Sequence, residues 1–361
     1  MIRIALLFAQ SDANATLSYQ HGWPRAFMES PLFEVVPFNF ADRSLAARVA
    51  LVGGIAASRV DAIVLLHSMY SNRSELPGPL PWLLGRLPQP KAFFIGNEYK
   101  SMPEKMAFCR ALRLSLLISQ CNSAPVLDLY RRALGCAVAC VPNTGIDDGI
   151  FSPRVPLADR KIDIGYRSYE GPWYLGNREK IEIADFFVGI ASRYGLKVDI
   201  SLDPKDRFDA AGYATFLNRC RAQIGTESGG DYFELTDATR KAVNAYMIDH
   251  PDAGWPDVRR RFFDGYGPSM PLRIISGRQV EAAACKTVQI LMEGTYNGYF
   301  QAGTHYIPLR KDYSNADDVV RMLRDNALCA AMTDAAYQVA RQELTYDRLT
   351  GKFAEALAPI L

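Results

Sequence analysis

The stretch Arg273–Gly294 reads RIISGRQVEAAACKTVQILMEG and contains a helix start, a helix and a strand. Ser276 is followed three residues later by Gln279, which is the spacing of a capping box and predicts that a helix begins here. Thr287–Leu291 then has the length and composition of a strand. A helix that leads into a strand in this way is one step of an alternating α/β fold.

The same alternation runs through the first 142 residues, where short apolar runs are separated by segments with helical spacing. Strand, helix and strand at this spacing indicate parallel βαβ units, and continuously apolar strands are typical of a sheet covered on both faces. The expected strands are Ile2–Phe8, Phe33–Pro37, Asp61–Leu66, Ala92–Ile95, Leu114–Ile118 and Ala137–Val141.

A segment without periodicity follows at Val141–Arg160, with three prolines and two glycines, and the alternation restarts at Lys161. We therefore expect an α/β chain with two doubly wound, Rossmann-like domains that face each other across a cleft. Residues 1–142 form the N-terminal domain, 143–160 the linker and 161–340 the C-terminal domain.

Two further segments complete this organisation. Residues from about 228 to 271 are mostly helical by pattern and interrupt the second domain, so we expect a helical insertion there. Residues 341–361 are expected to form a C-terminal helix that packs back toward the N-terminal domain.

Composition narrows the class of protein. The chain has 361 residues, 49% hydrophobic and 22% charged, which is typical of a globular protein. A net charge of +2 disfavours nucleic acid as a structural partner, although it leaves a modified nucleic acid open as a substrate. We expect a cytoplasmic protein without a membrane span, because the N-terminus has no signal-peptide pattern and the seven scattered cysteines suit reduced thiols.

The first turn of the helix at 277 has the features of an anion site. Gly277 and Arg278 combine free backbone N–H groups, the helix dipole and a guanidinium, which suits a diphosphate. Glu281 lies three residues after Arg278 on the same helix face, where a carboxylate can accept hydrogen bonds from ribose hydroxyls. The alternative is an ordinary amphipathic helix with an exposed Arg–Glu pair.

The run Arg278-Gln-Val-Glu281-Ala-Ala-Ala-Cys285, followed by a strand and Glu293-Gly294, resembles the nucleotide-sugar signature of GT-B glycosyltransferases. It is most similar to the group 1 branch that includes spore-maturation-protein-like members. The linker Val141–Pro153 resembles the domain crossing of that fold, and Gly303-Thr-His-Tyr-Ile-Pro308 resembles its ending. The resemblance covers about 140–357 apart from the insertion, and over 1–140 it is architectural only.

The resemblance implies a donor site in the C-terminal domain and an acceptor site in the N-terminal domain. Two residues depart from the pattern: Arg273 stands where retaining members have the first glutamate of Glu-x7-Glu, and Lys286 stands where the family has glycine. Arg167 and Arg178 flank the loop in which related enzymes place a cation, and one of them is expected to act. The expected diphosphate ligands are Arg278, Ser276, Gly277, Arg273 and Arg167, the ribose ligand is Glu281, and the donor sugar or base ligands are Glu227, Thr226, Gly294, Thr295 and Tyr296.

A general base is expected at the strand ends of the N-terminal domain. Glu98 follows the fourth strand and His67 the third, so both lie where a base could reach an acceptor hydroxyl. Each also has a purely structural alternative, since a lone histidine after a strand is more often structural. We expect Glu98 ahead of His67. If neither acts, the alternatives are His21 and a base-free mechanism in which the leaving phosphate takes the proton.

These features together predict a hexosyltransferase-type glycosyltransferase. It would move a sugar from a nucleotide-diphospho-sugar, in UDP or GDP form, to an unidentified acceptor hydroxyl. No Asp-x-Asp motif stands in a suitable loop, so we expect no metal and no other cofactor. The alternatives are a nucleotide-sugar epimerase or hydrolase of the same architecture, and a non-catalytic nucleotide-sugar-binding protein, which the missing first glutamate keeps open.

Overall fold

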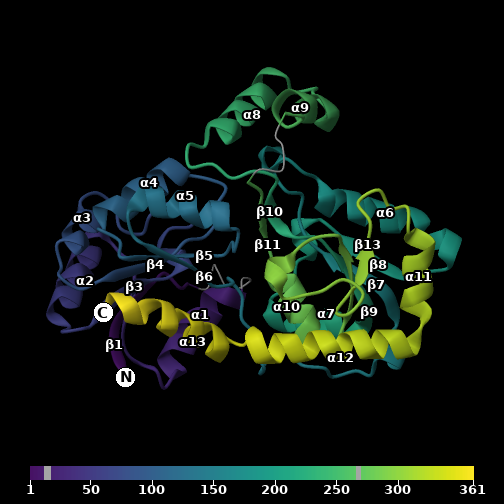
Figure 1. Ribbon diagram of the computed structural model, residues 1–361, viewed down its shortest axis with the longest axis horizontal. Coiled ribbons are helices and arrows are strands. Elements are labelled where there is room, and N and C mark those ends of the chain that lie inside the picture. The colour runs from purple at the N-terminus through teal and green to yellow at the C-terminus, as the bar shows by residue number, and fades with distance from the viewer. Residues whose placement is uncertain (12–17, 266–269) are drawn as a thin grey trace. The chain divides into compact units, whose positions relative to one another are not determined.

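The computed structural model describes residues 1–11, 18–265 and 270–361 (Figure 1). Contacts divide the described chain into two compact units. Unit 1 contains Met1–Asn143, Gly229–Leu272 and Tyr346–Leu361, and unit 2 contains Thr144–Ser228 and Arg273–Thr345. The segment that interrupts unit 2 in the sequence therefore makes its contacts within unit 1. The functional domain boundaries expected from the sequence stay a prediction.

The core of unit 1 is a six-stranded parallel sheet with the order β2-β1-β3-β4-β5-β6. The order reverses between β1 and β3, and ligands of doubly wound sheets bind at such a switch point, beyond the carboxyl ends of the strands. The strands are β1 (Ile2–Phe8), β2 (Phe33–Asn39), β3 (Ala62–Leu65), β4 (Lys91–Phe94), β5 (Leu116–Ser119) and β6 (Ala137–Cys140).

Helices cover both faces of this sheet, as two neighbouring residues of β4 show. The Phe93 ring lies 5.5 Å from Phe108 of α4, whereas the Phe94 ring lies 4.9 Å from Trp23 of α1 and 5.1 Å from Phe353 of α13. In Figure 1, α13 lies beside α1. The helices are α1 (Ser18–Glu29), α2 (Leu45–Ala57), α3 (Leu80–Gly85), α4 (Met102–Ala111), α5 (Ala124–Leu134) and α13 (Tyr346–Leu357).

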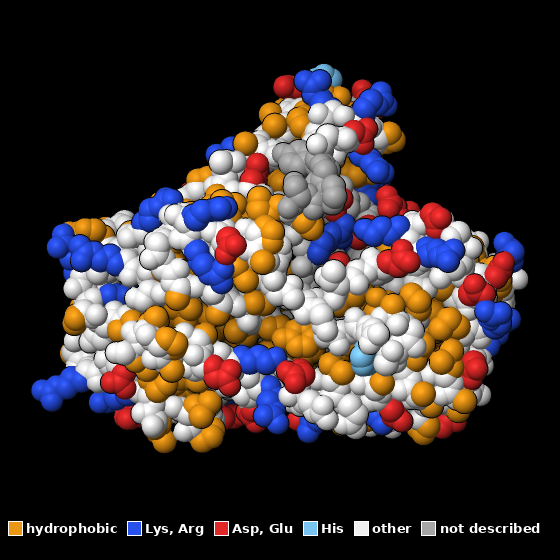
Figure 2. Space-filling model, viewed as in Figure 1, with side chains coloured by type: hydrophobic (Ala, Val, Ile, Leu, Met, Phe, Trp, Pro, Cys, Tyr) orange, Lys and Arg blue, Asp and Glu red, His pale blue; other side chains and the backbone are white. Residues whose placement is uncertain are grey.

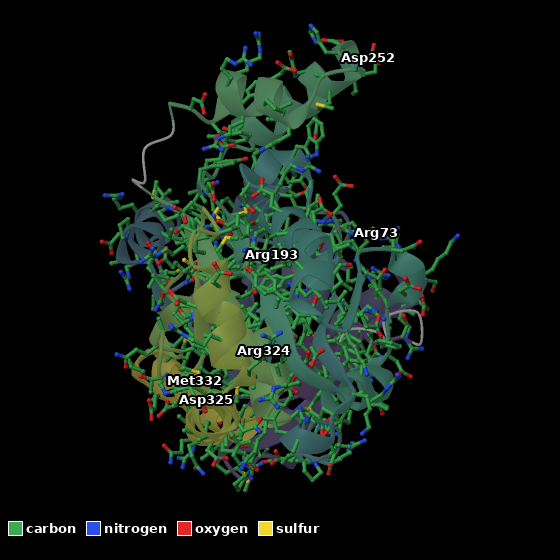
Figure 3. All side chains as sticks on the ribbon, turned by 90° about the vertical axis from the view of Figure 1, so that its right-hand side faces the viewer. Arg73, Arg193, Asp252, Arg324, Asp325 and Met332 are labelled. Carbon is green, nitrogen blue, oxygen red and sulfur yellow. The ribbon has the colours of Figure 1, made fainter. Side chains whose placement is uncertain are left out.

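The segment Gly229–Leu272 adds a helical hairpin to unit 1. It contains α8 (Ala238–Asp249) and α9 (Trp255–Phe262), and Asp252 lies in the turn between them (Figure 3). At its base, the Phe233 ring packs edge-on against Tyr130 of α5 at 5.1 Å. Figure 2 shows both basic and acidic side chains over these two helices.

Unit 2 repeats the architecture of unit 1. Its five-stranded parallel sheet has the order β13-β12-β9-β7-β8. Read in reverse, from β8 to β13, the second strand along the chain is followed by the first, third, fourth and fifth, as in β2-β1-β3-β4-β5 of unit 1. The prediction of two Rossmann-like arrays is confirmed. The switch point lies between β7 and β9. The strands are β7 (Ile162–Arg167), β8 (Val198–Ser201), β9 (Cys220–Gly225), β12 (Val288–Met292) and β13 (Ile307–Leu309).

Helices cover both faces of the second sheet as well. Ile164 of β7 belongs to a buried cluster with residues of α6, α11 and α12, whereas a Cβ at Gly165 would lie 2.7 Å from Phe216 of α7. Asp325 caps α12 through the Leu328 backbone N–H, and Figure 3 labels it next to Met332 of the same helix. The helices are α6 (Glu179–Tyr194), α7 (Ala210–Arg219), α10 (Gly277–Ala284), α11 (Ala316–Arg324) and α12 (Asn326–Glu343).

A two-stranded ribbon, β10 (Ser228–Gly230) and β11 (Leu272–Ile274), closes the base of the insertion and was not predicted. A Cβ at Gly229 would lie 1.8 Å from the Leu272 carbonyl oxygen, and Gly229 has a positive φ of 95°, so this crossing requires glycine. Among the helices that the structure describes, none is both long enough and apolar enough to cross a bilayer.

Candidate functional site

The N-terminus of α10 is fixed against β9 by two glutamine side chains. The Gln279 Oε1 atom accepts from the Ser276 backbone N–H at 2.9 Å, so the predicted capping box forms at this helix start. Gln279 Nε2 donates to the Thr226 carbonyl at 3.1 Å, and Gln223 Nε2 donates to the Arg278 carbonyl at 2.9 Å. The helix start is therefore held beside the switch point of the second sheet.

Gly277 is the first residue of α10 and lies against Thr144. A Cβ at this position would lie 2.9 Å from Thr144 Oγ1, which is closer than normal packing allows. The close approach of Thr144 to the first turn of α10 therefore depends on the absence of a side chain at position 277.

Arg278 follows at the second position of α10 and is half-buried. Within the described residues, its Nε atom is buried and has no hydrogen-bond partner. A buried guanidinium N–H without an acceptor costs free energy, which an anionic ligand would remove. The charge of Arg278 also acts on the neighbouring Tyr166 of β7, where it opposes the rise in pKa that burial causes.

Lys180, in the first turn of α6, is a candidate residue that the sequence analysis missed. Its side chain is 8% exposed, and its Nζ lies 4.7 Å from the centre of the Tyr169 ring. Burial, and then the charges of Arg278 and Arg273, lower the pKa of Lys180 to about 7. Cations in the first turns of α6 and α10 thus act on one another electrostatically.

Arg273 is held by a carboxylate. Its Nη1 and Nη2 atoms lie 2.6 and 3.0 Å from the two oxygens of Glu179, and Lys311 Nζ lies 2.9 Å from Glu179 Oε1. Burial on its own would raise the pKa of Glu179, but Arg273 and Lys311 outweigh it and lower that pKa. The predicted contact of Arg273 with a diphosphate stays a prediction.

The two arginines that flank the loop after β7 have different surroundings. Arg167 donates to the Asp199 carboxylate at 2.6 Å and stacks over the Phe216 ring at 4.5 Å, so it ties β7 to β8 and α7. Arg178 precedes α6, lies 3.6 Å from Glu170, and has a buried Nε without a hydrogen-bond partner in the described chain. Of the two, Arg178 is nearer in sequence to Lys180.

Glu227 joins the loops that follow β9 and β12. Its Oε1 atom accepts from the backbone N–H groups of Thr295 at 3.0 Å and Tyr296 at 2.7 Å, and from the Thr295 hydroxyl at 2.9 Å. A Cβ at Gly294 would lie 2.7 Å from Glu227 Oε2. The structure therefore brings together Thr226, Glu227, Gly294, Thr295 and Tyr296, although their predicted contacts with the donor stay untested.

Glu281 lies one turn after Arg278 on α10 and is 7% exposed. The pKa of Tyr213 on α7 is raised mainly by burial and next by the negative charge of Glu281. Tyr213 in turn donates to Gln223 of β9 at 3.1 Å. A carboxylate so placed can accept hydrogen bonds from a ligand at the start of α10, and its ribose role stays a prediction.

The buried carboxylate of Glu98 in unit 1 accepts several hydrogen bonds. It accepts from the Ser119 hydroxyl, the Gln120 backbone N–H and the Tyr130 hydroxyl, each at 2.8 Å. Burial raises the pKa of Glu98, and these three donors and Lys105 oppose the rise. Glu98 therefore anchors the loop after β4 to the end of β5.

His67 begins the turn that follows β3, at the switch point of unit 1. Its ring lies 5.3 Å from Phe94, 5.9 Å from Tyr19 and 6.2 Å from Trp23, and burial lowers its pKa to about 3. His21, on α1, has Nδ1 2.6 Å from Gln10 Nε2 beyond the neighbouring strand β1. His67 and His21 thus follow the two strands that flank the switch point, whereas Glu98 follows β4.

Two Rossmann-like units with the same strand order define the GT-B fold, and the fold expected from the resemblance is confirmed. Many solved structures resemble the chain, and three of them show the likeness over nearly its whole length. They are Anabaena HepE in complex with UDP-glucose (13% identity, TM-score 0.52, covering 99% of this chain and 100% of that one), a glycosyltransferase from Rickettsia africae (10%, 0.54, 99% and 98%), and the N-terminal domain of trehalose-6-phosphate phosphatase from Candida albicans (11%, 0.57, 100% and 97%).

At these identities the likeness establishes the fold alone. No family model matches the sequence, and no curated protein matches it either. The particular branch of GT-B proteins therefore stays a prediction. Among the described residues, no three or more His, Cys, Asp or Glu side chains are grouped so as to hold a metal ion.

Proposed function

We propose that this protein is a glycosyltransferase that moves a sugar from a nucleotide-diphospho-sugar to an acceptor hydroxyl. One observation carries the proposal: Arg278, in the first turn of α10, has a buried Nε without a hydrogen-bond partner among the described residues, and its charge acts on the buried Lys180 in the first turn of α6. Such an arrangement favours a diphosphate, because both helix dipoles and both cations attract negative charge. The similarity to HepE, which was solved with UDP-glucose, supports the choice of donor.

Negative charge builds up on the diphosphate as the bond to the sugar breaks. Cations and helix N–H groups that are already in place stabilise that charge without reorganising, which lowers the barrier. Arg278 is the guanidinium in this role, and Lys180 is the ammonium. A neutral Lys180 becomes protonated when a diphosphate arrives, since the anion offsets the repulsion from Arg278.

The rest of the donor is assigned to the residues around α10. Glu281 accepts hydrogen bonds from the ribose hydroxyls. The two loops joined by Glu227 line the sugar or the base, with the Thr295 and Tyr296 backbone fixed in position by that carboxylate. A preorganised loop of this kind reduces the entropy that ligand binding would otherwise cost.

The acceptor is assigned to unit 1, with the base at the strand ends. His67 lies at the switch point and is neutral at physiological pH, but the burial that lowers its pKa to about 3 also makes it a weak base. Glu98 has the higher basicity of the two because burial raises its pKa, but it must release one of its three hydrogen bonds to act. Both stay candidates, and we propose that the reaction needs no metal ion.

The proposal is tested by incubating the full chain with UDP-glucose and, separately, with GDP-linked sugars. Release of UDP or GDP together with free sugar, in the absence of acceptor, would show cleavage of the donor, which either a glycosyltransferase with water as a slow substitute acceptor or a hydrolase produces. Recovery of an epimer of the sugar on intact nucleotide would show an epimerase instead. Binding without any turnover would leave only a nucleotide-sugar-binding protein.

Arg321→Ala is the matched control for Arg278→Ala in this assay. Arg321 is exposed on α11 and, among the residues that the structure describes, pairs only with Asp318 three residues earlier, so its removal is expected to leave the site intact. Retention of donor turnover after addition of EDTA would support the absence of a metal, and its loss would contradict it.

A further inference from the structure

The loop after β4 in unit 1 is held rigidly in an unusual backbone conformation. Lys105, which is fully buried on α4, donates from Nζ to the Gly96 carbonyl at 2.5 Å and to the Asn97 carbonyl at 2.9 Å. Asn97 and Ser101 both have positive φ, 47° and 54°. Left-handed backbone at two non-glycine residues costs free energy and is found most often at functional sites.

The insertion contributes a carboxylate to the same loop. Asp237 is 1% exposed, and its Oδ1 accepts from the Met102 backbone N–H at 3.3 Å, at the first residue of α4. Its Oδ2 contacts Arg240 on α8, with Nη2 at 2.6 Å and Nε at 3.1 Å. One carboxylate thus places the Arg240 guanidinium next to the start of α4, two residues after Lys100.

Lys100 lies half-buried beside this guanidinium without a carboxylate of its own. Its Nζ donates to the neutral Asn72 Oδ1 at 2.5 Å, and no carboxylate within residues 1–11, 18–265 and 270–361 forms an ion pair with it. Burial, and then the charge of Arg240, lower the pKa of Lys100. Like charges brought together in a partly buried place are unfavourable unless an anion joins them.

Cations outnumber carboxylates by three to two among the side chains named in the cluster around Lys100. The cluster contains the cations Lys100, Lys105 and Arg240 and the carboxylates Glu98 and Asp237, which act on one another electrostatically. Protonation of Glu98, which burial favours, would increase the excess further. The cluster stands at the carboxyl ends of β3 and β4, the edge of a parallel sheet at which ligands bind.

We propose that Lys100 and Arg240 bind an anionic oxygen group, such as a phosphate, on the acceptor. This deepens the proposed function, on which it rests, by naming the class of acceptor: a hydroxyl compound that also bears an oxyanion. The ammonium of Lys100 supplies a point charge, and the guanidinium of Arg240, whose Nε and Nη2 already contact Asp237, supplies a second positive charge. The insertion is then part of acceptor recognition, since Arg240 comes from it.

Inorganic phosphate is the probe for a direct test that does not need the acceptor or the donor. Thermal unfolding of the Arg278→Ala variant is followed against phosphate, with chloride used to hold the ionic strength constant. The background substitution removes the main guanidinium of the donor site, so that phosphate binding there is weakened. We expect phosphate to raise the unfolding temperature, because it binds only the folded state.

Lys100→Gln is then added and should weaken apparent phosphate binding by about tenfold or more, as loss of a charge-assisted hydrogen bond implies. Lys100 forms no ion pair with the described residues, so this change is not expected to unfold the loop. Arg240→Lys keeps the charge next to Asp237 and should give a smaller loss. Lys241→Gln, an exposed neighbour on α8, is the matched control and should leave phosphate binding unchanged.

Equal phosphate binding in Lys100→Gln and Lys241→Gln would overturn the proposal, as would the absence of any phosphate effect in the Arg278→Ala background. Repeating the measurement with acetate and with sulfate distinguishes a site that prefers a carboxylate ligand from one that prefers a tetrahedral oxyanion. Failure of the glycosyltransferase assay with normal phosphate binding would count against the proposed function and not against the anion site.

Discussion

Arg273 and Glu179 form a two-point ion pair, 94 residues apart in sequence, with N–O distances of 2.6 and 3.0 Å. Arg273 stands at the position where the resembling family has a glutamate. Here the carboxylate comes instead from the first residue of α6, and an arginine faces it. This pairing engages the Arg273 side chain, so Arg278 and Lys180 are the cations to which we assign the diphosphate.

Arg278→Ala should weaken binding of UDP-glucose by about 1.5–3 kcal/mol, the range for a hydrogen bond to a charged group. The physical reason is that Arg278 is placed to meet the diphosphate from the helix start. Calorimetric titration of the variant and of Arg321→Ala provides the measurement. Unaltered affinity in both variants would remove Arg278 from the donor site.

Lys180 should couple nucleotide binding to proton uptake. Its pKa is near 7 in the free protein, and a bound diphosphate raises it, so binding of UDP at about pH 8 draws a proton from the buffer. Titrations in buffers of different ionisation enthalpy measure this uptake. Lys180→Met should abolish it, and persistence of the same uptake in the variant would assign it elsewhere.

The same lysine should make the stability of the free protein depend on pH. Since the folded pKa lies below the unfolded value, the unfolded chain binds more protons between about pH 7 and pH 10.4, so stability rises with pH in that window. Lys180→Met should flatten the rise and stabilise the protein at pH 7, by about 1.4 kcal/mol for each pH unit that the pKa is lowered. Urea unfolding at several pH values tests this, and an unchanged slope would contradict it.

Glu281→Gln should harm nucleotide binding less than Glu281→Ala. The amide keeps one acceptor oxygen for the ribose, whereas alanine leaves ligand hydroxyls unpaired at a cost of about 1–3 kcal/mol. The affinities of the two variants for UDP, and for ribose phosphate, which has no uracil, are measured and compared. Wild-type affinity in both would show that Glu281 does not bind the ribose.

Glu98→Gln and His67→Ala should separate turnover from donor affinity. The variant that lacks the base should lose turnover and keep its affinity for UDP-glucose, because the donor is assigned to unit 2. Loss of folded protein is checked by the unfolding temperature, since Glu98 accepts three hydrogen bonds in the core of unit 1. Full turnover in both variants would direct attention to His21.

Gly294→Ala should destabilise the loop after β12 by about 1–3 kcal/mol, because the added methyl group would displace Glu227 from its three hydrogen bonds. Gly189→Ala is the control, and it is expected to change the stability in the opposite direction. Gly189 lies within α6 with open space around it, so alanine should stabilise the helix by about 0.5–1 kcal/mol. Thermal unfolding measures both, and a neutral Gly294→Ala would show that the loop yields easily.

The sheets could be predicted because parallel strands buried on both faces leave a direct pattern in the sequence. Ile2–Phe8 is the same in the prediction and in the structure, and AIVL at β3 is buried throughout. The ribbon β10–β11 escaped prediction because Ser228-Gly-Gly230 has low strand propensity, and the pairing depends on a partner 44 residues away at Leu272. Such long-range pairings are not written in any local pattern.

The candidate site was predictable only where a local motif marked it. Ser276 and Gln279 showed the helix start by their spacing, and the structure confirms it. Lys180 gave no such signal, since a lysine in the first turn of an amphipathic helix usually lies in solvent. Its burial beneath Tyr169 and its repulsion by Arg278 arise from tertiary structure alone.

Unit 1 is assembled from three separate segments of the chain, and this sets an order on its synthesis. Phe353 of α13 contacts Phe27 and Phe33, both made more than three hundred residues earlier. While the ribosome is still translating unit 2, those aromatic rings lack their partner and present apolar surface. Unit 1 therefore begins to be made before unit 2, yet its aromatic core is completed only once α13 has been translated.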